Sequence, residues 1–400
     1  MRRWQTRPLG ETCAINPKLV ASEAPAADAE VTFVPMAAVD EVSGTIARPE
    51  LRQYRQVAKG YTPFRENDVL FAKITPCMQN GKAAIARGLR GGLGFGSTEF
   101  HVLRPSPGLL PQWVFAFVRQ PSFRAAAEAN FTGTAGQQRV PADFLRSFPI
   151  PVPPLAEQER IVKLLDEADE LRKLRAQADR RTAALIPALF HEMFGDPATN
   201  PKHWPTRRLR ELGVKFSDGP FGSNLKSSHY TPEGVRVIRL QNIGVGCLID
   251  HDKAYISPEH FASLRKHECL PGDVLVGTLG EPNLRACVLP EEIHQALNKA
   301  DCVQIRPHPQ VATAAFICWL LNLPSTLEMA SGMILGQTRA RISMGRLAEL
   351  VVPVPLLQIQ REFAQRVTEI RELEAAQAAT RRRLEDLFHS LLHRAFDEGL

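Results

Sequence analysis

Two short stretches of this chain combine side chains that can recognise DNA with a glycine that exposes the backbone. They contain Gln137, Gln138 and Arg139 after Gly136, and Gln337, Arg339 and Arg341 after Gly336. Glutamine can pair with adenine and arginine with guanine, and arginine also binds phosphate. The glycine lets the backbone approach a partner closely. Because repeated residues cannot explain the reading of two different sequences, we favour phosphate or structural contacts over base contacts for these side chains.

A second group of candidates lies in the first half of the chain. A strand-like apolar run is followed directly by Lys73 and then by Asn80 and Lys82, which flank Gly81. Two lysines and an amide beside a glycine turn could hold a phosphate group. A solvated turn with no ligand is an equally good interpretation of the same residues.

Polar residues of the second half supply the remaining candidates. Ser223 and Lys226 lie in a glycine-punctuated loop in which Phe221 is expected to be a packed anchor. Both could contact phosphate, and a solvated loop is again the alternative. Arg239 and Asn242 follow a predicted strand, and we expect at least one of them to face a DNA groove.

Motifs that mark common catalytic sites are missing from the sequence. There is no G-x-x-x-x-G-K-[ST] loop and no H-E-x-x-H zinc motif. None of the 12 lysines has an acidic residue two positions earlier, and the Pro-Pro pair at 153–154 does not match the N/D-P-P-aromatic motif of base-flipping amino-methyltransferases. The seven cysteines form no C-x-x-C pair and are expected to be reduced, mostly buried thiols. We therefore expect no catalytic residue, no metal site and no cofactor of the chain's own.

The composition limits the possible classes of protein. A chain of 400 residues is too long for one compact core, and 44% hydrophobic with 23% charged residues excludes a mainly disordered or fibrous protein. The net charge is +6, and 37 of the 49 basic residues are arginines, which suits binding to nucleic acid without requiring it. The longest apolar run, Val311–Leu323, is too short to cross a bilayer, and no signal peptide is visible. We expect a cytoplasmic protein without membrane contact.

The sequence is duplicated at an offset of 200 to 205 residues. The run from Trp4 to Glu11 matches the run from Trp204 to Glu211 at its Trp, Thr, Arg, Leu and Glu residues. Further pairs follow in the same order, namely Asp68 with Asp273, Arg104 with Arg306, Gly136 with Gly336, and Gln158 with Gln360. Such an ordered series indicates a tandem duplication. A doubled chain of this kind tends to place equivalent surfaces around an internal two-fold axis.

Each half begins with short apolar runs and ends with a long helical pattern. Glycine and proline interrupt the apolar runs, which predicts the short strands and turns of an α+β domain. After Leu155, apolar residues recur at alternating steps of three and four, which is typical of a coiled-coil seam. This seam comprises Ile161, Leu164, Ala168, Leu171, Leu174 and Ala178. Pro187 is expected to kink or end the helix at about Ile186.

These patterns predict an α+β protein with two pseudo-symmetric α/β domains, separated by an antiparallel pair of long coiled-coil helices. The predicted boundaries are 1–154 for the first domain, 155–195 for the first helix and junction, 196–355 for the second domain and 356–400 for the second helix. Two unpaired surface helices are the alternative. Their equal placement in the two halves favours pairing.

Three motifs resemble the specificity (S) subunits of type I restriction–modification systems. The first is the run MFGDPATNPKHWP at 193–205, and the second is DGPFGSNLK at 218–226. The third is Gly-Gln-x-Arg followed by Pro-x-Pro and a glutamine at the start of a helix, which is present in both halves. The resemblance covers essentially the whole chain, because the order, the duplication and the junction agree.

This resemblance implies that each domain is a target recognition domain for one half of a bipartite double-stranded DNA site. The helices would set the unread gap and dock two adenine-N6 methyltransferase (M) subunits, and motor-nuclease (R) subunits would join the full complex. S-adenosylmethionine, ATP and Mg²⁺ would bind those partner subunits. The heads of the two helices carry Gln158, Arg160, Gln360 and Arg361. We expect these residues near the docking surface, with solvated helix ends as the alternative.

Two other functions remain open on the sequence alone. A DNA-modifying enzyme with a diverged site would show turnover without a partner. A protein-only scaffold would bind its partners with little dependence on salt, whereas phosphate contacts impose a steep dependence.

Overall fold

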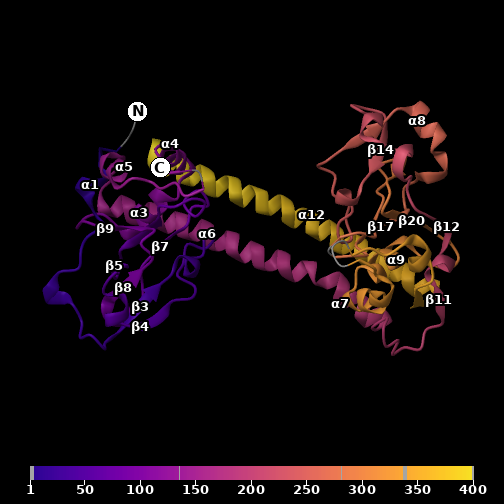
Figure 1. Cartoon of the computed structure of the whole chain (residues 1–400), viewed down its shortest axis with the longest axis horizontal. Helices are drawn as coiled ribbons and strands as arrows, with labels where there is room; N and C mark the ends of the chain where they lie inside the picture. The colour runs from indigo at the N-terminus through magenta and orange to yellow at the C-terminus, as the bar shows by residue number, and fades with distance from the viewer. Residues whose placement is uncertain (1–3, 135, 281, 337–339, 399–400) are drawn as a thin grey trace. The chain divides into compact units, whose positions relative to one another are not determined.

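The structure is a computed structural model that describes residues 4–134, 136–280, 282–336 and 340–398. The chain divides into two compact units (Figure 1). Unit 1 comprises Met1–Arg175 and Thr380–Leu400, and unit 2 comprises Ala176–Ala379. Within the described ranges, no helix has both the length and the apolar character that are needed to cross a membrane.

Unit 1 contains an antiparallel sheet in the order β2 (Cys13–Ile15), β9 (Phe100–Pro105), β6 (Val69–Ala72) and β7 (Ala83–Ile85). A second sheet has the order β4 (Glu50–Gln53), β3 (Glu30–Val34), β8 (Leu93–Gly96) and β5 (Thr62–Arg65), and β3 and β8 are parallel. A separate strand pair joins β1 (Thr6–Pro8) to β10 (Pro149–Pro151). The helices of the domain are α1 (Leu9–Thr12), α2 (Tyr54–Val57), α3 (Pro111–Val118), α4 (Pro121–Ala129) and α5 (Ala142–Ser147).

Strand β6 explains why these apolar runs become buried strands. Val69 and Phe71 belong to the same core cluster as Trp113 of α3, whereas Leu70 belongs to a second cluster with Phe64 of β5. Successive side chains of a strand point to opposite faces, so a strand that is covered on both faces needs an uninterrupted apolar run.

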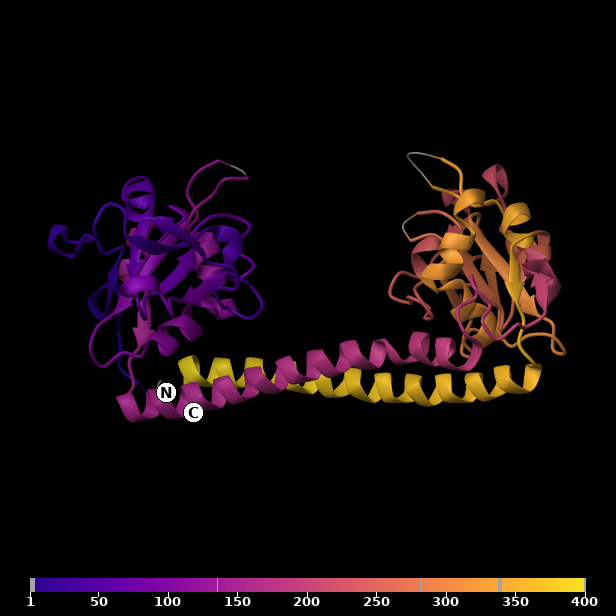
Figure 2. The ribbon, with the colours of Figure 1, turned by 90° about the horizontal axis from the view of Figure 1, so that it is seen from below.

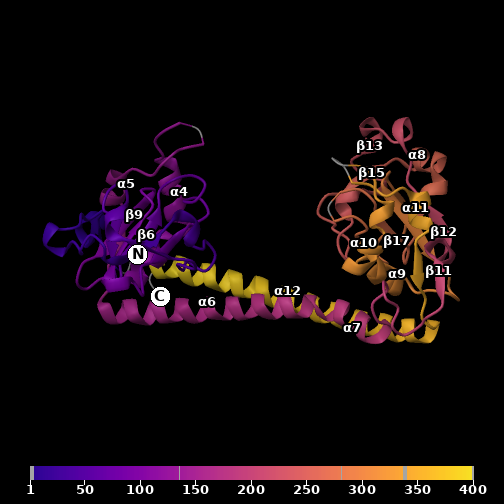
Figure 3. The same ribbon diagram turned by 60° about the horizontal axis from the view of Figure 1, so that its bottom comes forward.

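Unit 2 repeats this topology with one additional edge strand, β13. One sheet has the order β12 (Gly213–Ser217), β20 (Cys302–Pro307), β17 (Val274–Gly277) and β18 (Ala286–Val288). The other has the order β13 (Tyr230–Thr231), β15 (Ala254–Ile256), β14 (Val235–Ile238), β19 (Ala296–Asn298) and β16 (Glu268–Cys269), and β14 and β19 are parallel. Strands β11 (Thr206–Arg208) and β21 (Val351–Pro353) form the separate pair. The helices are α8 (Pro258–Ser263), α9 (Ala314–Leu321), α10 (Pro324–Met329) and α11 (Met344–Ala348), with α9 lying against β17 and β18 (Figure 3).

The two units share a buried ion pair at the same place in their sheets. Asp68 accepts from Nε and Nη2 of Arg104 at 2.8 and 2.7 Å. Asp273 accepts from the same two atoms of Arg306 at 2.8 and 2.9 Å. Both aspartates are 1% exposed, so the bidentate ion pair with arginine compensates the buried charge of each carboxylate. The duplication that the sequence predicts is therefore present in three dimensions.

The long helices are α6 (Leu155–Ala183), α7 (Leu185–Phe194) and α12 (Leu357–His393). In unit 1, the start of α6 lies beside the end of α12 (Figure 2). Ile161 of α6 shares a core cluster with Leu392 of α12. In unit 2, Phe190 of α7 lies 5.6 Å from Phe363 near the start of α12, measured between ring centroids. In both units, opposite ends of the two helical segments meet. The predicted α+β class, with a repeated α/β domain and an antiparallel pair of long helices, is confirmed.

Two details of the first helix differ from the prediction. Leu171 and Leu174 are about half exposed, at 51% and 52%, so they are not part of a packed seam in this structure. The helical break lies at Ala184, three residues before Pro187 and earlier than predicted. A proline ring clashes with the carbonyl about one turn earlier and cannot donate a hydrogen bond to it, so the regular helix ends there, and Pro187 occupies the first turn of α7.

Candidate nucleic-acid interface

In unit 1, the loop at 132–139 is closed at its base beside the end of β6. Thr132 and Arg139 exchange two backbone hydrogen bonds of 3.0 and 2.9 Å. The carbonyl of Lys73, directly after β6, accepts a hydrogen bond of 2.9 Å from the backbone N–H of Val140. The fold therefore gathers several predicted residues at one end of the sheet, namely Lys73, Gln137, Gln138 and Arg139.

The guanidinium of Arg139 is fixed by the carboxylate of Glu99. Nε and Nη2 of Arg139 each donate to a Glu99 oxygen at 2.9 Å, and Nη1 donates to the carbonyl of Gln137 at 2.9 Å. The hydrogen bonds from Arg139 hold the pKa of Glu99 below its usual range, against the smaller opposing effect of burial. Since its fork is already bound, Arg139 positions the loop. Gln137 is exposed in the same loop and is better placed to contact a ligand.

The loop at 335–341 repeats this geometry in unit 2. Leu335 and Arg341 exchange two backbone hydrogen bonds, both of 2.8 Å. Nε of Arg341 lies 2.7 Å from a carboxylate oxygen of Asp301. Arg341 is therefore the structural counterpart of Arg139, whereas the repeated Gly-Gln-x-Arg motif pairs Arg139 with Arg339. The predicted residues that lie outside the described part of the chain are Gln337 and Arg339.

Cations and aromatic rings gather at this end of unit 2. The guanidinium of Arg341 lies 5.4 Å from the ring centroid of Phe221. Phe221 is 46% exposed and is therefore not the packed anchor that the sequence predicts. Arg239 and Lys299 lie 6.0 and 5.5 Å from the ring centroid of Tyr230. Cations beside aromatic faces suit the phosphates and bases of nucleic acid.

Lys299 and Tyr230 are absent from the sequence-based predictions. The missing signal is the pairing of β14 with β19. Because these strands are parallel, the residues that follow them, Arg239 and Lys299, emerge at the same edge of the sheet. Parallel pairing joins segments that are far apart in the sequence, so the pattern of a single strand cannot reveal it.

Asn242 braces a turn instead of facing a groove. Its Nδ2 donates to the carbonyls of Ile249 and Asp252 at 3.0 and 2.8 Å, and its Oδ1 accepts from the backbone N–H of Arg239 at 2.9 Å. The side chain is fully buried, which corrects its assignment as a DNA contact. Arg239 is partly exposed and forms an ion pair of 2.5 Å with Asp252, so it stays a candidate.

Asn80 and Lys82 lie in the turn between β6 and β7 and face another loop. Nδ2 of Asn80 donates to Glu41 at 3.3 Å, and Nζ of Lys82 donates to the carbonyl of Met36 at 3.4 Å. Asn80 and Lys82 therefore contact residues 36–41, whereas the start of the same connection contacts the loop at 132–139, through the backbone N–H of Thr75 and the carbonyl of Gln138 at 3.0 Å. In unit 2, the candidates with exposed side chains are Ser223 and Lys226.

Gln158 and Gln360 fasten each long helix to its domain. Oε1 of Gln158 accepts from the N–H of Leu110 at 2.9 Å, and its Nε2 donates to the carbonyls of Gly108 and Pro153, both at 2.9 Å. Gln360 makes the same three bonds with residues 313, 311 and 355, at 3.0, 3.0 and 2.8 Å. Both side chains are fully buried. The expectation that they contact partner subunits is therefore wrong, because all their polar atoms are used inside the domain.

Arg160 and Arg361 follow the two buried glutamines on the outer side of each helix. Both are exposed, and Arg160 pairs with Glu157 at 3.0 Å, one turn earlier. They remain candidates for a docking surface, because an exposed arginine can exchange a solvated ion pair for one with a partner.

Burial disfavours the reactive thiolate form of two cysteines. Burial raises the pKa of Cys13 and of Cys318 to about 12, so both are protonated at neutral pH. Cys247 is the exposed exception among the cysteines. Within the described ranges, no group of three or more His, Cys, Asp and Glu side chains is placed to hold a metal ion.

Comparison with known proteins identifies similar sequences and similar structures. Residues 1–179 match the family model described as type I restriction modification DNA specificity domain. The EcoEI and EcoAI specificity subunits of type I restriction enzymes from Escherichia coli are 41% and 38% identical over 175 residues. These alignments cover 42% of this chain and 29% of each relative, so the chain matches less than a third of their length.

Two solved structures from type I restriction–modification systems are similar in fold to this chain. A chain from a study of the assembly and conformational transition of the type I R-M system has a TM-score of 0.67 at 23% identity and covers 99% of this chain and 98% of its own length. The S subunit from M. genitalium has a TM-score of 0.54 at 17% identity and covers 100% and 97%. Residues 1–179 are therefore similar in sequence to the type I restriction modification DNA specificity domain, the family that the repeated motifs of the chain resemble.

Proposed function

We propose that this protein is the DNA sequence-recognition subunit of a type I restriction–modification complex. The proposal rests on one observation. Both units have a loop that is held by an arginine–carboxylate pair, but different side chains lie beside that pair. Unit 1 presents Lys73 and Gln137 beside the Arg139–Glu99 pair, and unit 2 presents Lys299 and Phe221 beside the Arg341–Asp301 pair. A common framework with unlike contact residues suits two different half-sites.

The proposal assigns the chemistry to other subunits. Two adenine-N6 methyltransferase subunits, and motor-nuclease subunits in the full complex, would bind S-adenosylmethionine, ATP and Mg²⁺, and the assembly would act in the cytoplasm. The chain itself would bind double-stranded DNA and would not be an enzyme. The buried thiols and the missing catalytic motifs support this assignment.

A footprinting experiment tests the proposal. The chain is purified with its methyltransferase subunits, and hydroxyl-radical cleavage is mapped on DNA that carries the site of the system. We expect two short protected patches with an unprotected gap, and affinity that falls steeply with salt. One continuous patch, or methyl transfer by the chain alone with S-adenosylmethionine, would contradict it.

A further inference from the structure

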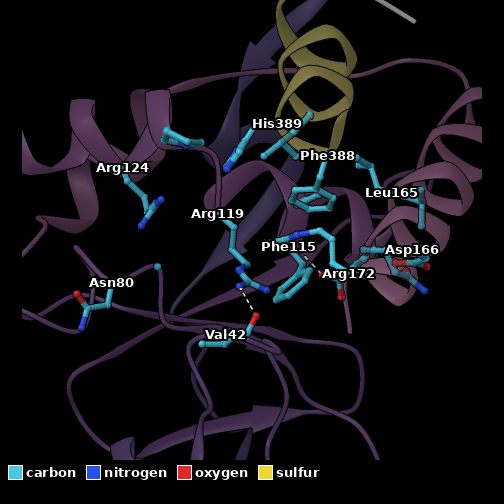
Figure 4. Close-up of a pocket in the computed structure, with 17 residues that line it drawn as sticks. Val42, Asn80, Phe115, Arg119, Arg124, Leu165, Asp166, Arg172, Phe388 and His389 are labelled. Atoms are coloured by element: carbon cyan, nitrogen blue, oxygen red, sulfur yellow. Dashed lines mark hydrogen bonds and ion pairs between the residues drawn. The ribbon is translucent and has the colours of Figure 1, made fainter. Parts of the chain in front are cut away.

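Unit 1 contains a cavity of about 310 Å³ between its domain and the long helices. Helices α3 and α4 and the loop at Val42 form one side, and α6 and the end of α12 form the other. Figure 4 shows Phe115, Arg119 and Phe388 around its middle. A volume of this size lies at the lower end of the range for small-molecule sites.

Larger side chains occupy the corresponding positions in unit 2. The Gln158 and Gln360 braces align the long helices at an offset of 202, and the buried faces of α3 and α9 align at an offset of 203. On this alignment, Ala116 and Asp169 of the cavity correspond to Trp319 and Arg371 of unit 2. The guanidinium of Arg371 lies 5.3 Å from the Trp319 ring centroid. Unit 1 therefore has a methyl group and a carboxylate where unit 2 has an indole and a guanidinium.

A glycine of a neighbouring loop lies against an arginine and an aromatic ring in both units, but these side chains come from different positions. Gly246 adopts a φ of +68°, and a Cβ atom there would meet Arg371 and Trp319 at 2.4 and 2.6 Å. Gly44 adopts a φ of +66°, and a Cβ atom there would meet Arg119 and Phe115, both at 2.4 Å. In unit 1, the arginine and the aromatic ring that hold the glycine loop thus both come from α3 and its end. Asp169 of α6, which corresponds to Arg371, is not among the nearest neighbours of Gly44, and the cavity lies between α3 and α6.

The two ends of the cavity carry opposite charges. At one end, Arg124 donates from Nη1 to the carbonyl of Gln79 at 2.7 Å, while its buried Nε has no hydrogen-bond partner in the described structure. At the other end lies Asp166 (Figure 4). Partial burial, and then the carboxylate of Asp169, raise the pKa of Asp166, and the neighbouring Arg172 donates to Asp169 at 3.2 Å. The aromatic rings lie between these ends.

We propose that this cavity binds a nucleoside monophosphate whose base carries an exocyclic amino group. The base would occupy the space beside Ala116, at the position of the Trp319 indole in unit 2, next to Phe115 and to the Phe388 ring that Arg172 contacts at 4.4 Å, and its amino group would donate to Asp166. The phosphate would lie toward Arg124 and Arg119, whose guanidinium groups suit phosphate oxygens. This site is separate from the proposed recognition of DNA and does not depend on it.

Calorimetric titration of the full chain with AMP tests the proposal against two matched probes. Purine riboside 5′-monophosphate lacks only the amino group, and adenosine lacks only the phosphate. We expect AMP to bind and each probe to bind at least tenfold more weakly. No heat of binding with AMP at millimolar concentration would overturn the proposal, as would equal affinities for AMP and purine riboside 5′-monophosphate.

Three variants assign the binding to this cavity. Ala116→Trp should fill it as Trp319 does in unit 2 and should abolish AMP binding. Asp166→Asn should remove the preference for AMP over purine riboside 5′-monophosphate, and Arg124→Met should weaken AMP more than adenosine. Arg146→Met, at an exposed ion pair outside the cavity, is the control and should bind AMP like the wild type. Unchanged AMP binding by folded Ala116→Trp or by Asp166→Asn would contradict the assignment.

Discussion

Units 1 and 2 are alike where polar groups are buried and differ where the long helices contact the domain. Each has a buried aspartate–arginine pair and a glutamine that fastens the helix. In unit 2, however, Arg371 of α12 also donates to the carbonyl of Gly246 at 2.7 Å, whereas in unit 1 a cavity lies between α3 and α6. A buried polar network loses several bonds when one member changes, but an apolar or exposed contact can be rearranged one residue at a time. The framework of the duplication is therefore held by its polar braces.

The largest effect should follow removal of a buried aspartate. Asp273→Ala would leave the guanidinium of Arg306 without its carboxylate partner. It would also remove the acceptor of the backbone N–H of Leu270, which donates to Asp273 at 2.7 Å. Breaking a buried pair in this way costs about 3–5 kcal/mol, and Asp68→Ala should act similarly in unit 1. Urea unfolding measures both variants. The control is Asp143→Ala, at an exposed ion pair, which should change the free energy of unfolding by less than about 1 kcal/mol. A loss below that value for both buried aspartates would contradict the shared framework.

The pH dependence of stability should distinguish the units. Burial lowers the pKa of His101 in β9 to about 4 from 6.5, and Nε2–H of the neutral ring donates to the carbonyl of Val140 at 2.8 Å. The aligned residue of β20 is Val303, which cannot titrate. As the pH falls below 6.5, His101 binds a proton in the unfolded state before it does so in the folded state. Its contribution to the free energy of unfolding is therefore complete above pH 6.5 and is lost as the pH falls toward 4. The loss is roughly 3 kcal/mol in unit 1.

Thermal unfolding between pH 4 and 7 measures this difference. His101→Gln keeps a donor for Val140 and should flatten the pH dependence of the unit 1 transition, while leaving that of unit 2 unchanged. Equal slopes for the wild type and His101→Gln would show that other groups control the acid sensitivity.

Loss of either glutamine brace should have a smaller effect that is similar in both units. Gln158→Ala and Gln360→Ala each remove three hydrogen bonds and leave buried backbone groups unsatisfied, for a cost of about 2–3 kcal/mol. Chemical denaturation checks the two values, and Gln365→Ala, at an exposed position of α12, is the control. Values that differ by more than about 2 kcal/mol would mean that the two braces are not equivalent.

The smallest effect should come from the contact that only unit 2 makes with its helix. Arg371→Ala removes the hydrogen bond to Gly246 and the contact with Trp319, at a cost of about 1–2 kcal/mol to unit 2. Arg366→Ala, at an exposed position of the same helix, should leave the melting temperature nearly unchanged. Destabilisation of unit 1 by Arg371→Ala would contradict the assignment of this contact to unit 2.

The sequence predicts the framework of this protein better than its surface. The repeat pairs Asp68 with Asp273 and Gln158 with Gln360, and the structure places both pairs in equivalent bonds. The same repeat assigns the wrong partner to Arg139, because the Gly-Gln-x-Arg motif aligns at an offset of 200, whereas the hydrogen-bonded loop ends align at offsets of 203 and 202. Burial of Asn242 and the pairing of Arg239 with Lys299 depend on contacts between segments that are distant in sequence, so local patterns cannot reveal them.

The central claim is that each unit reads its own half of a bipartite DNA site. The most direct test maps methylated adenines across the genome of cells that carry the chain with its methyltransferase partners. Gln137→Ala combined with Gln138→Ala changes the loop at 132–139 of unit 1. Ser223→Ala combined with Lys226→Ala changes a different exposed loop, at 222–226 of unit 2. We predict a bipartite motif for the wild type, of which each double variant relaxes or loses a different half. Loss of both halves together in folded variants, or a single continuous motif, would contradict the claim.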